Sequence, residues 1–432
     1  MSLSDPDPVS PHVLPAKIDV LVIGGGPAGS TAACLLAEQG WQVALCEQDQ
    51  HPRFHIGESL LPSNLPILEQ LGVLEQVQAM AIYKPGADFT CRDGTVQSFP
   101  FARAYGDSPP HAYQVRRQDF DHLLLNNAAC KGVQVFQRHK VIACQQEERG
   151  QCVQIENAAG EKHAVHARLV IDASGRAALT ATRSGWQVKN RRHASAAIFA
   201  HFKGVTRRSG VLEGNISVYW FEHGWIWMIP LSDDVMSVGA VCSPEFLKTR
   251  DTDLESFLRK ILAGIRGAGE RMVHSSLLGE VHATGNYSYQ SREISAPGVI
   301  LVGDAFAFID PVFSSGVYLA MFGATRSIAP AQAWLRGDTA EFKRAIRQYR
   351  AEVERKINAF AWFIYRFTSP TMQELFENPR NDWQVEQAVI SMLAGDGDAG
   401  ADIRRRLRIF KTIYYLMSLK RNARMVFGSK NK

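Results

Sequence analysis

The chain has 432 residues, of which 46% are hydrophobic and 21% are charged, as in a globular protein large enough for two or three packed units. Its formal net charge of +5 is too small to indicate a nucleic-acid partner. The charge is unevenly placed, because residues 401–432 hold ten Lys or Arg residues against Asp402 alone; this segment carries +9 and the remainder −4.

The cysteines and the N-terminus bear on the cell compartment. None of the seven cysteines lies in a CxxC pair or has a histidine at the spacing of a metal site, so we expect reduced, buried thiols, no metal ion and a cytoplasmic location. Residues 1–16 lack the regions of a signal peptide and are expected to form a flexible tail. Residues 20–37 carry no charge, but their central Gly-Gly-Gly-Pro argues against a transmembrane helix.

Residues 17–47 have the pattern of a dinucleotide-binding unit. Residues 18–23 predict a buried parallel strand, a helical pattern follows, and residues 42–47 predict a second strand that closes on Glu47. Strand, glycine turn, helix, strand and acid follow in the order that such a fold requires. We therefore expect Glu47 to bind the ribose hydroxyls of a dinucleotide.

The turn in this unit contains Gly24, Gly26 and Gly29 in the spacing G-x-G-x-x-G. The first glycine makes the tight turn, the second lets the backbone approach a pyrophosphate, and the third lets helix and strand pack closely. The phosphates would then lie at the positive end of the helix. Ala28, in the same segment, is counted among the expected cofactor contacts.

Residues 224–230, Gly-Trp-Ile-Trp-Met-Ile-Pro, predict a strand with a continuous apolar face. Alternate side chains of a strand share one face, so Trp225, Trp227 and Ile229 should form one wall. An ordinary sheet core explains such a wall, because aromatic residues favour strands and bury large areas. A wall with a catalytic purpose is the alternative.

Two other segments indicate that the dinucleotide is FAD. Residues 168–176 predict a buried strand and polar turn, and residues 298–324 predict a strand, Gly303-Asp304, a turn and an apolar helix. Asp304 resembles the aspartate of flavin hydroxylases that binds the ribityl chain. Arg117 resembles the arginine that these enzymes place on FAD.

Pieces of one nucleotide fold that are more than a hundred residues apart imply an inserted second domain. The predicted fold class is α/β with α+β insertions. Its predicted parts are a Rossmann-like FAD-binding domain (residues 17–80, 111–185 and 290–330), an inserted antiparallel β-sheet substrate domain (81–110 and 186–289), and a helical C-terminal region with a basic tail (331–432).

From Lys17 into the C-terminal region the chain resembles the flavin-dependent halogenases, in the branch that acts on phenolic or pyrrolic substrates, often tethered to a carrier protein. Residues 224–230 match W-x-W-x-I-P, and FIDPVFSSG, residues 308–316, matches F-x-x-P-x-x-S-x-G. HIGESLLP at residues 55–62, followed by YKPGADF at 83–89, matches the stretch with the catalytic lysine of the family. Residues 384–396 resemble a C-terminal stretch of the carrier-linked branch.

The resemblance implies a reaction and its partners. Reduced FAD reacts with O2 to a flavin hydroperoxide, chloride or bromide attacks it, and the resulting hypohalous acid halogenates an electron-rich ring. No complete second dinucleotide fingerprint is evident, so a separate flavin reductase that uses NAD(P)H is expected to supply FADH2. The substrate is either a small aromatic molecule or one carried by an acidic acyl or peptidyl carrier protein.

The resemblance also implies roles for residues of this chain. Trp225 and Trp227 would keep flavin and substrate apart, and Lys84 would carry the electrophile between them, which requires burial that lowers its pKa. Ser314 joins this catalytic group. The backbone amides of Ser315 and Gly316, at a helix N-terminus, would hold the halide. The remaining expected FAD contacts are Arg53, Glu58, Ser59, Arg117, Asp304, Pro311, Gly316 and Val317.

One position departs from the tryptophan-type halogenases, which place a glutamate where this chain has Phe313. The phenol and pyrrole branch accounts for the change, because electron-rich rings need less assistance. We therefore name no acid or base aimed at the substrate. The candidates for its ring pocket are Tyr219, Phe221, His111 and Tyr113.

Residues 331–432 predict mainly helices. Ile403, Leu407, Phe410, Tyr414 and Met417 form an apolar stripe at helical spacing. Either this helix packs on the FAD-binding domain with a solvated basic face, or the basic face docks an acidic carrier protein or a membrane surface.

The sequence leaves three functions open. Halogenation is favoured by the tryptophan pair, Lys84 and the Ser-Ser-Gly turn together. A flavin-dependent aromatic hydroxylase of the same fold is the alternative. A flavoprotein reductase of polyene or isoprenoid double bonds, with the apolar wall lining a lipid tunnel, is the third.

Overall fold

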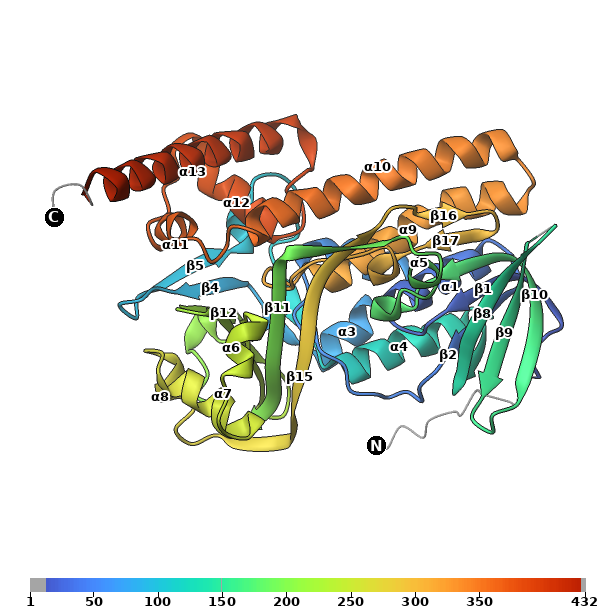
Figure 1. Ribbon diagram of the computed structural model, residues 1–432, viewed down its shortest axis with the longest axis horizontal. Helices are drawn as coiled ribbons and strands as arrows, with labels where there is room; N and C mark the ends of the chain where they lie inside the picture. Colours follow the sequence, from blue (N-terminus) through green and yellow to red (C-terminus); the bar gives the residue numbers. More distant parts are fainter. Residues whose placement is uncertain (1–12, 149, 429–432) are drawn as a thin grey trace.

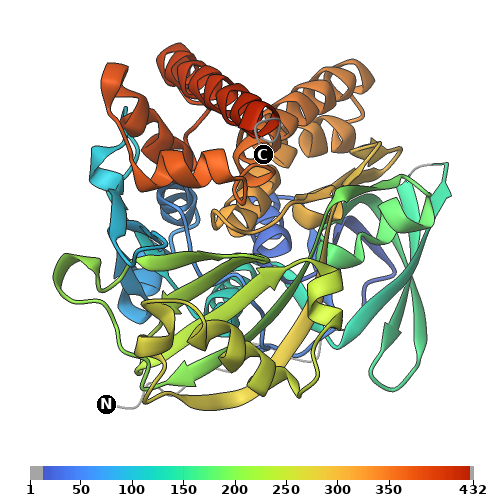
Figure 2. The same ribbon diagram turned by 60° about the vertical axis from the view of Figure 1, so that its left-hand side comes forward.

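The computed structural model describes residues 13–148 and 150–428 (Figures 1 and 2). Within them, the strands form two eight-stranded sheets and one two-stranded ribbon. Residues 1–12 of the predicted tail and Lys430 and Lys432 of the basic segment lie outside these ranges.

The first sheet contains the strands in which the sequence predicts the dinucleotide site. Its strands are β1 (Lys17–Ile23), β2 (Val43–Glu47), β7 (Gln134–Gln137), β8 (His139–Glu147), β9 (Gly150–Asn157), β10 (Lys162–Asp172), β16 (Ser295–Ala296) and β17 (Val299–Leu301). The order is β16-β17-β10-β1-β2-β7, parallel from β17 to β7, and β8 and β9 extend antiparallel from β10. Parallel sheets are buried on both faces, which matches the continuous apolar runs predicted as strands.

Helices cover this sheet. They are α1 (Pro27–Glu38), α2 (Leu65–Gln70), α3 (Leu74–Met80), α4 (Arg117–Cys130), α5 (Leu179–Arg183), α9 (Ser315–Leu335) and α10 (Thr339–Ile364). Helix α1 packs against α4 and α9, and α10 lies along α9 (Figure 1). The Tyr349 hydroxyl of α10 donates to the Leu301 carbonyl at 2.8 Å, which fixes α10 to the end of β17.

The second sheet is antiparallel except where β12 and β4 pair in parallel. Its strands are β4 (Gly86–Thr90), β5 (Val96–Pro100), β11 (Gln187–Lys203), β12 (Ile216–Phe221), β13 (Gly224–Pro230), β14 (Val235–Cys242), β15 (Ser276–Ser291) and β18 (Ala307–Phe308). The order is β18-β15-β11-β14-β13-β12-β4-β5. The long strands β11 and β15 of this sheet run side by side (Figure 1). Helices α6 (Pro244–Lys248), α7 (Leu254–Ala263) and α8 (Ala268–Arg271) accompany this sheet.

Two strand pairings cross the predicted domain boundaries. Strand β3 (Ile82–Lys84) pairs with β6 (Ala112–Gln114), so a segment expected in the substrate domain joins one expected in the FAD-binding domain. Strand β18 pairs with β15 of the second sheet although its residues were expected in the FAD-binding domain. The α/β fold class with an inserted antiparallel sheet and C-terminal helices is confirmed.

The predicted tryptophan strand is β13, and all seven of its residues are buried. Trp225, Trp227 and Ile229 belong to the main core, whereas Ile226 and Met228 belong to a second core under α7 and α8. The alternation predicted from the sequence therefore holds. Gly239 on β14 makes room for the wall, because a Cβ there would lie 2.3 Å from ring carbons of Trp227.

The C-terminal region is helical, with α11 (Pro370–Glu377), α12 (Val385–Leu393) and α13 (Gly400–Gly428), which extends past the body of the molecule at one end (Figures 1 and 2). Of the predicted stripe, Ile403, Leu407, Phe410 and Tyr414 are buried, and Met417 is half-buried. The basic residues of the first turns, Arg404, Arg405 and Arg408, are exposed. Over the described part of the chain, we find no helix with the length and apolar character needed to cross a bilayer.

The expectation that the cysteines are uniformly buried is wrong. Cys130 is exposed at the end of α4, and Cys144 and Cys152 are half-buried on the outer strands β8 and β9. Cys152 also brings its sulfur within 4.8 Å of ligand atoms of Glu147 and His166. The sequence spacing does not reveal this group, because its members come from three neighbouring strands.

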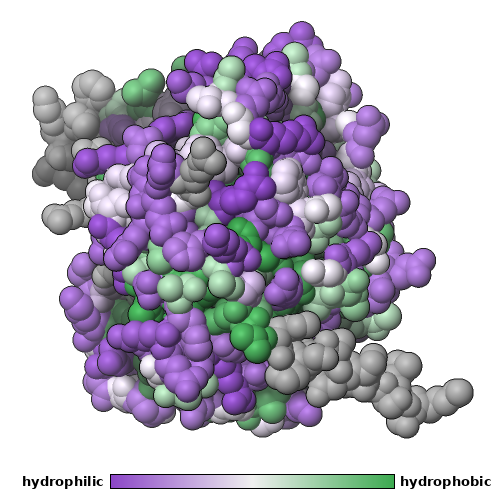
Figure 3. Space-filling model, turned by 90° about the vertical axis from the view of Figure 1, so that its right-hand side faces the viewer, coloured by the Kyte–Doolittle hydropathy of each residue, from purple (hydrophilic) through white to green (hydrophobic). Residues whose placement is uncertain are grey.

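The face of the molecule on the side of the first sheet is mostly hydrophilic, with hydrophobic residues gathered in a central band (Figure 3).

Candidate active site

A cavity of about 690 Å³ is lined by residues of both sheets, including the β1–α1 turn, β13 and β15. This volume is typical of a cofactor or ligand site. The predicted residues that line it are Gly24, Gly26, Ala28, Glu47, Arg53, Glu58, Ser59, Arg117, Trp225, Trp227, Asp304, Pro311, Ser314, Gly316 and Val317. Gly29, Lys84 and Ser315 are not part of the lining.

The glycine turn leaves space for a ligand on one side only. Gly24 has a φ of +99°, and a Cβ there would meet the Ala173 carbonyl oxygen at 2.5 Å. A Cβ on Gly29 would lie 1.9 Å from the Gly24 oxygen, so Gly29 serves the packing of turn and helix. A Cβ on Gly26 would have only an Arg53 nitrogen within 4 Å, at 3.8 Å. The open side at Gly26 fits the close approach of a dinucleotide phosphate.

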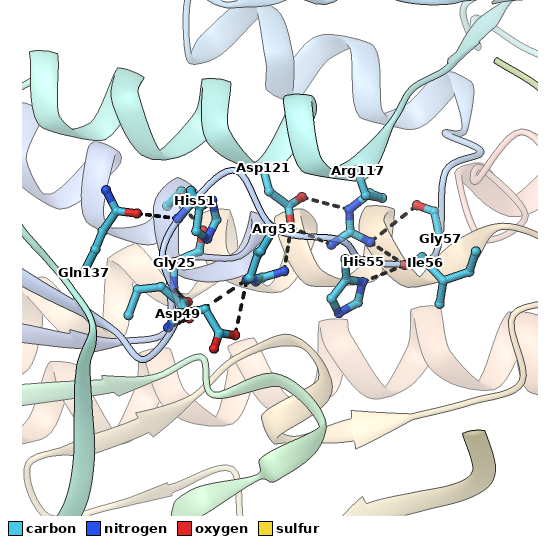
Figure 4. Close-up of polar contacts among 12 residues, drawn as sticks. Gly25, Asp49, His51, Arg53, His55, Ile56, Gly57, Arg117, Asp121 and Gln137 are labelled. Atoms are coloured by element: carbon cyan, nitrogen blue, oxygen red, sulfur yellow. Dashed lines mark hydrogen bonds and ion pairs between the residues drawn. The ribbon is translucent and has the colours of Figure 1, made fainter. Parts of the chain in front are cut away.

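A network of acids and arginines holds the loop after β2 beside this turn (Figure 4). Glu47 accepts from the backbone N–H of Gly25 at 2.6 Å and of Asp49 at 2.9 Å. Arg53 lies 3.6 Å from Asp121, and Arg117 pairs with the same carboxylate at 2.8 Å. The two guanidiniums are thus positioned at the cavity by one buried acid on α4.

Burial and charge shift the pKa values of two groups at this cavity. The pKa of His55 falls to about 4, first because Arg117 is near and then because of burial, so the imidazole is neutral at pH 7. Burial raises the pKa of Asp304 to about 6, although Arg176 and Arg117 oppose the rise. Asp304 lies three residues after the end of β17, where the sequence predicted an FAD contact.

The tryptophan wall is fixed by hydrogen bonds. The rings of Trp225 and Trp227 are 5.8 Å apart, and Trp227 Nε1 donates to the Ser237 hydroxyl at 3.1 Å. The Trp225 side chain hydrogen-bonds Asp310, whose carboxylate also accepts from Ser195 at 3.1 Å; burial raises the pKa of Asp310 to about 6. Asp310 therefore joins the W-x-W-x-I-P segment to the segment at residues 308–316. Sequence reasoning missed this residue.

Phe313, at the departure from the glutamate, lies in a buried aromatic cluster. Its ring is 5.2 Å from Phe367, which in turn lies 6.4 Å from Trp225. Phe376 completes the group. An acid at position 313 would be buried among these rings.

Lys84 is 1% exposed at the end of β3. Its Nζ donates to the Ser59 hydroxyl and to the Leu60 carbonyl, each at 2.8 Å. Ser59 lines the cavity, so Lys84 lies directly behind the cavity lining at Ser59. Burial lowers the pKa of Lys84 to about 7, so that charged and neutral forms are both populated at neutral pH.

This pKa predicts a pH-dependent stability. Between pH 7 and 10.5 the unfolded chain keeps the Lys84 proton that the folded chain has released, so the free energy of unfolding should rise with pH in that window, by at most about 1.4 kcal/mol per pH unit. Below pH 7 both states are protonated and the full cost of burying the charge remains. Denaturant unfolding of wild type and Lys84→Met at several pH values measures the difference. Parallel pH profiles of the two proteins would contradict the lowered pKa.

The Ser-Ser-Gly turn opens helix α9. Ser314 occupies the cap position with a φ of +58° and makes no side-chain capping hydrogen bond. Ser315 is fully buried, and its hydroxyl has no hydrogen-bond partner in the described structure. The first backbone N–H groups of a long helix favour an anion, and Gly316 places them at the cavity.

The candidates for the ring pocket do not line this cavity. Tyr219 belongs to the second core, where Arg271 donates to its hydroxyl at 2.9 Å, and Phe221 packs against that core. His111 lies 3.1 Å from the Tyr113 hydroxyl, on the β3–β6 ribbon side. The cavity lining instead includes Phe54, Phe199 and His282, which stack together and which the sequence did not indicate.

Glu58 has a partner that sequence reasoning also missed. His201 of β11 lies 2.8 Å from one oxygen of the buried Glu58 carboxylate. The pair joins β11 of the second sheet to the loop after β2, which lines the cavity at Glu58. No local motif marks it, because 143 residues separate the partners.

Comparison with known proteins agrees with this geometry. The tryptophan halogenase family model matches residues 19–109 and 100–376. A tryptophan 2-halogenase of Chondromyces crocatus is 36% identical over 334 residues, which covers 75% of this chain but 63% of that protein, less than two thirds of its length. A 1H-pyrrole-2-carbonyl-[peptidyl-carrier protein] chlorinase of Pseudomonas fluorescens is 29% identical over 330 residues, covering 71% of this chain and 74% of that protein.

Two solved structures are similar over most of the chain. A flavoprotein/dehydrogenase of Cytophaga hutchinsonii superposes with a TM-score of 0.87 at 29% identity, covering 94% of this chain and all of the other. The myxobacterial chondrochloren halogenase superposes with a TM-score of 0.75 at 32% identity, covering 89% of this chain and 91% of the other.

The glycine turn, the parallel sheet and the cavity lined by residues of both sheets define a dinucleotide-binding fold with an inserted second sheet. The match to a family model identifies the class of enzyme to which this fold belongs. The chain belongs to the tryptophan halogenase family of flavin-dependent halogenases, a family of enzymes that implies FAD and halide.

Proposed function

We propose that this protein uses FADH2, O2 and chloride or bromide to halogenate an electron-rich phenolic or pyrrolic ring. The observation that carries the proposal is the placement of Lys84, which is buried and hydrogen-bonded to Ser59 at the cavity edge, where burial lowers its pKa to about 7. Transfer of an electrophilic halogen uses an amine held in this way, whereas hydroxylation directly by a flavin hydroperoxide requires no such group.

The residues present fit FAD. The open side of Gly26 would admit the pyrophosphate, Glu47 would bind the ribose, and Asp304 and Arg117 would hold the ribityl chain and ring system. When bound and reduced, FAD would activate O2 so that halide becomes hypohalous acid. A separate NAD(P)H-dependent reductase would supply the reduced flavin.

The protein contributes separation and transfer. Trp225 and Trp227 would block direct contact between flavin and substrate, and the amides of Ser315 and Gly316 would hold the halide. The neutral amine of Lys84 can accept the halogen of hypohalous acid, forming a nitrogen–halogen bond and releasing water; its ammonium form can only hydrogen-bond the acid. Phe313 supplies no acid or base, so the ring itself must be electron-rich.

Active halogen from halide is the decisive measurement. The anaerobically reduced FAD–protein complex is mixed with O2 and chloride, bromide or neither, and oxidising halogen is trapped with an added amine. We expect trapped halogen only with halide. Hydrogen peroxide alone, independent of halide, would overturn the proposal and favour an aromatic hydroxylase.

We also propose that the substrate arrives on an acidic carrier protein that docks on α13. The Pseudomonas fluorescens relative is a chlorinase of a pyrrole bound to a peptidyl carrier protein. In this chain Arg404, Arg405 and Arg408 are exposed on the helix whose other side is packed. Exposed arginines of this kind contribute more to the electrostatic attraction of an acidic partner than to the stability of the fold.

Charge reversal tests this docking. Changing Arg404, Arg405 and Arg408 to Glu should weaken binding of an acidic carrier at low salt by at least about tenfold, because attraction becomes repulsion. Binding is measured by titration calorimetry. Reversal of Lys248, Arg250 and Lys260, which are exposed near α6 and α7, is the matched control. Equal affinities of both variants would contradict docking on α13.

A further inference from the structure

A second cavity, of about 430 Å³, lies on a different face of α9 from the main cavity. Tyr318 and Phe322 of α9 line it, whereas Val317 and Ala320 line the main cavity. These two pairs point in nearly opposite directions around the helix. The first turns of α9 therefore separate two cavities.

The segment at residues 59–63 separates the same two cavities near Lys84. Ser59 lines the main cavity and Ser63 lines the second one. Between them, the Leu60 carbonyl accepts from Lys84 Nζ at 2.8 Å. The segment that holds Lys84 therefore borders the main cavity at Ser59 and the second cavity at Ser63.

The C-terminal segment that resembles the carrier-linked branch ends in the second cavity. Residues 384–396 run through α12 and finish at Asp396, which lines the cavity. The preceding Gly395 accepts from Lys356 Nζ at 3.2 Å through its carbonyl. No part of the halide chemistry uses this segment.

The second cavity is polar, and most of its charges are paired. Arg326 pairs with Glu352 at 3.3 Å, and Asp398 pairs with both Arg355 and Lys356. The apolar parts of its wall come from Pro66, Ile67, Pro109 and Phe322. Such a lining suits a neutral chain with amide and hydroxyl groups better than a charged ligand, since few lining charges are free to pair with one.

The mouth of this cavity adjoins the basic face of α13. The loop that carries Asp398 and Ala399 leads directly into α13, and Arg404 donates to the Asp398 carbonyl at 2.9 Å. A carrier protein seated on the basic face would hold its prosthetic arm at this opening.

We propose that the second cavity receives the pantetheine arm of the carrier and directs the attached ring toward Lys84 from the side away from the flavin. The inference rests on the proposed carrier-linked function. It accounts for the position of Lys84 beside residues 59–63, the segment that borders both cavities. The halogen would come from the main cavity and the ring from the second one.

Binding of pantetheine itself tests the proposal without a known substrate. Ala399 is exposed at the cavity, so Ala399→Trp fills the opening without disturbing the core. Ala158→Trp, at an exposed turn, is the matched control. In saturation-transfer NMR with the full-length protein, we expect pantetheine signals with wild type and the control, and signals reduced at least severalfold with Ala399→Trp.

The outcomes separate this inference from the proposed function. Amine-trapped halogen from chloride should be equal in all three proteins, because the main cavity is unchanged. Normal trapping without any pantetheine signal in wild type, or with an equal signal in Ala399→Trp, would overturn the arm site alone. Absence of trapped halogen in wild type would overturn the halogenase function itself.

Discussion

Replacing Lys84 with methionine should reduce halogen transfer to phenols and pyrroles by at least about 100-fold, the lower range for loss of a positioned acid–base group. Methionine preserves the apolar stem but removes the nitrogen that contacts Ser59 and Leu60. Oxygen consumption and amine-trapped halogen should continue, since the main cavity keeps its lining. Product formation from a panel of phenols and pyrroles is measured beside trapped halogen.

The matched control is Lys203→Met, an exposed lysine of β11 that should leave both readouts unchanged. Ser59→Ala removes one hydrogen bond to the amine and should have an intermediate effect. If Lys84→Met still halogenates the panel at the wild-type rate, hypohalous acid reaches the ring unaided and Lys84 has only a structural role.

The parts of the fold that could be predicted from the sequence are those written in contiguous residues. Residues 17–47 contain strand, turn, helix and strand in one run, and the structure has all four. The alternation in β13 is likewise local, and so is the helical pattern from residue 339 onward. In each case side-chain periodicity and turn chemistry determine the element.

The parts of the site that could not be predicted depend on pairing across long stretches of chain. Tyr219 was a candidate for the ring pocket, yet it pairs with Ile226 and so shares the face opposite Trp225 and Trp227. That register is not readable before the strands are paired. The position of Lys84 behind Ser59 depends in the same way on the pairing of β3 with β6. The contacts of Asp310 and His201 also join distant strands.

Two glycine substitutions in the β1–α1 turn should separate folding from cofactor binding. Gly29→Ala places a Cβ 1.9 Å from the backbone oxygen of Gly24, which cannot move without opening the turn. We expect it to cost about 1–3 kcal/mol or more, as overpacking does, and to lower the melting temperature of the apoprotein. Gly26→Ala meets nothing closer than 3.8 Å, so the apoprotein should melt as wild type does.

FAD binding, in contrast to apoprotein stability, should be weakened by Gly26→Ala. The Cβ of Gly26→Ala occupies the space through which the pyrophosphate would approach the backbone, so FAD should bind at least about tenfold more weakly and raise the melting temperature less than in wild type. Fluorescence titration of FAD and thermal melts with and without FAD measure both effects. Unchanged FAD affinity in Gly26→Ala would show that the cofactor does not lie on this side of the turn. Lowered apoprotein stability in Gly26→Ala would show instead that the turn has no free space there.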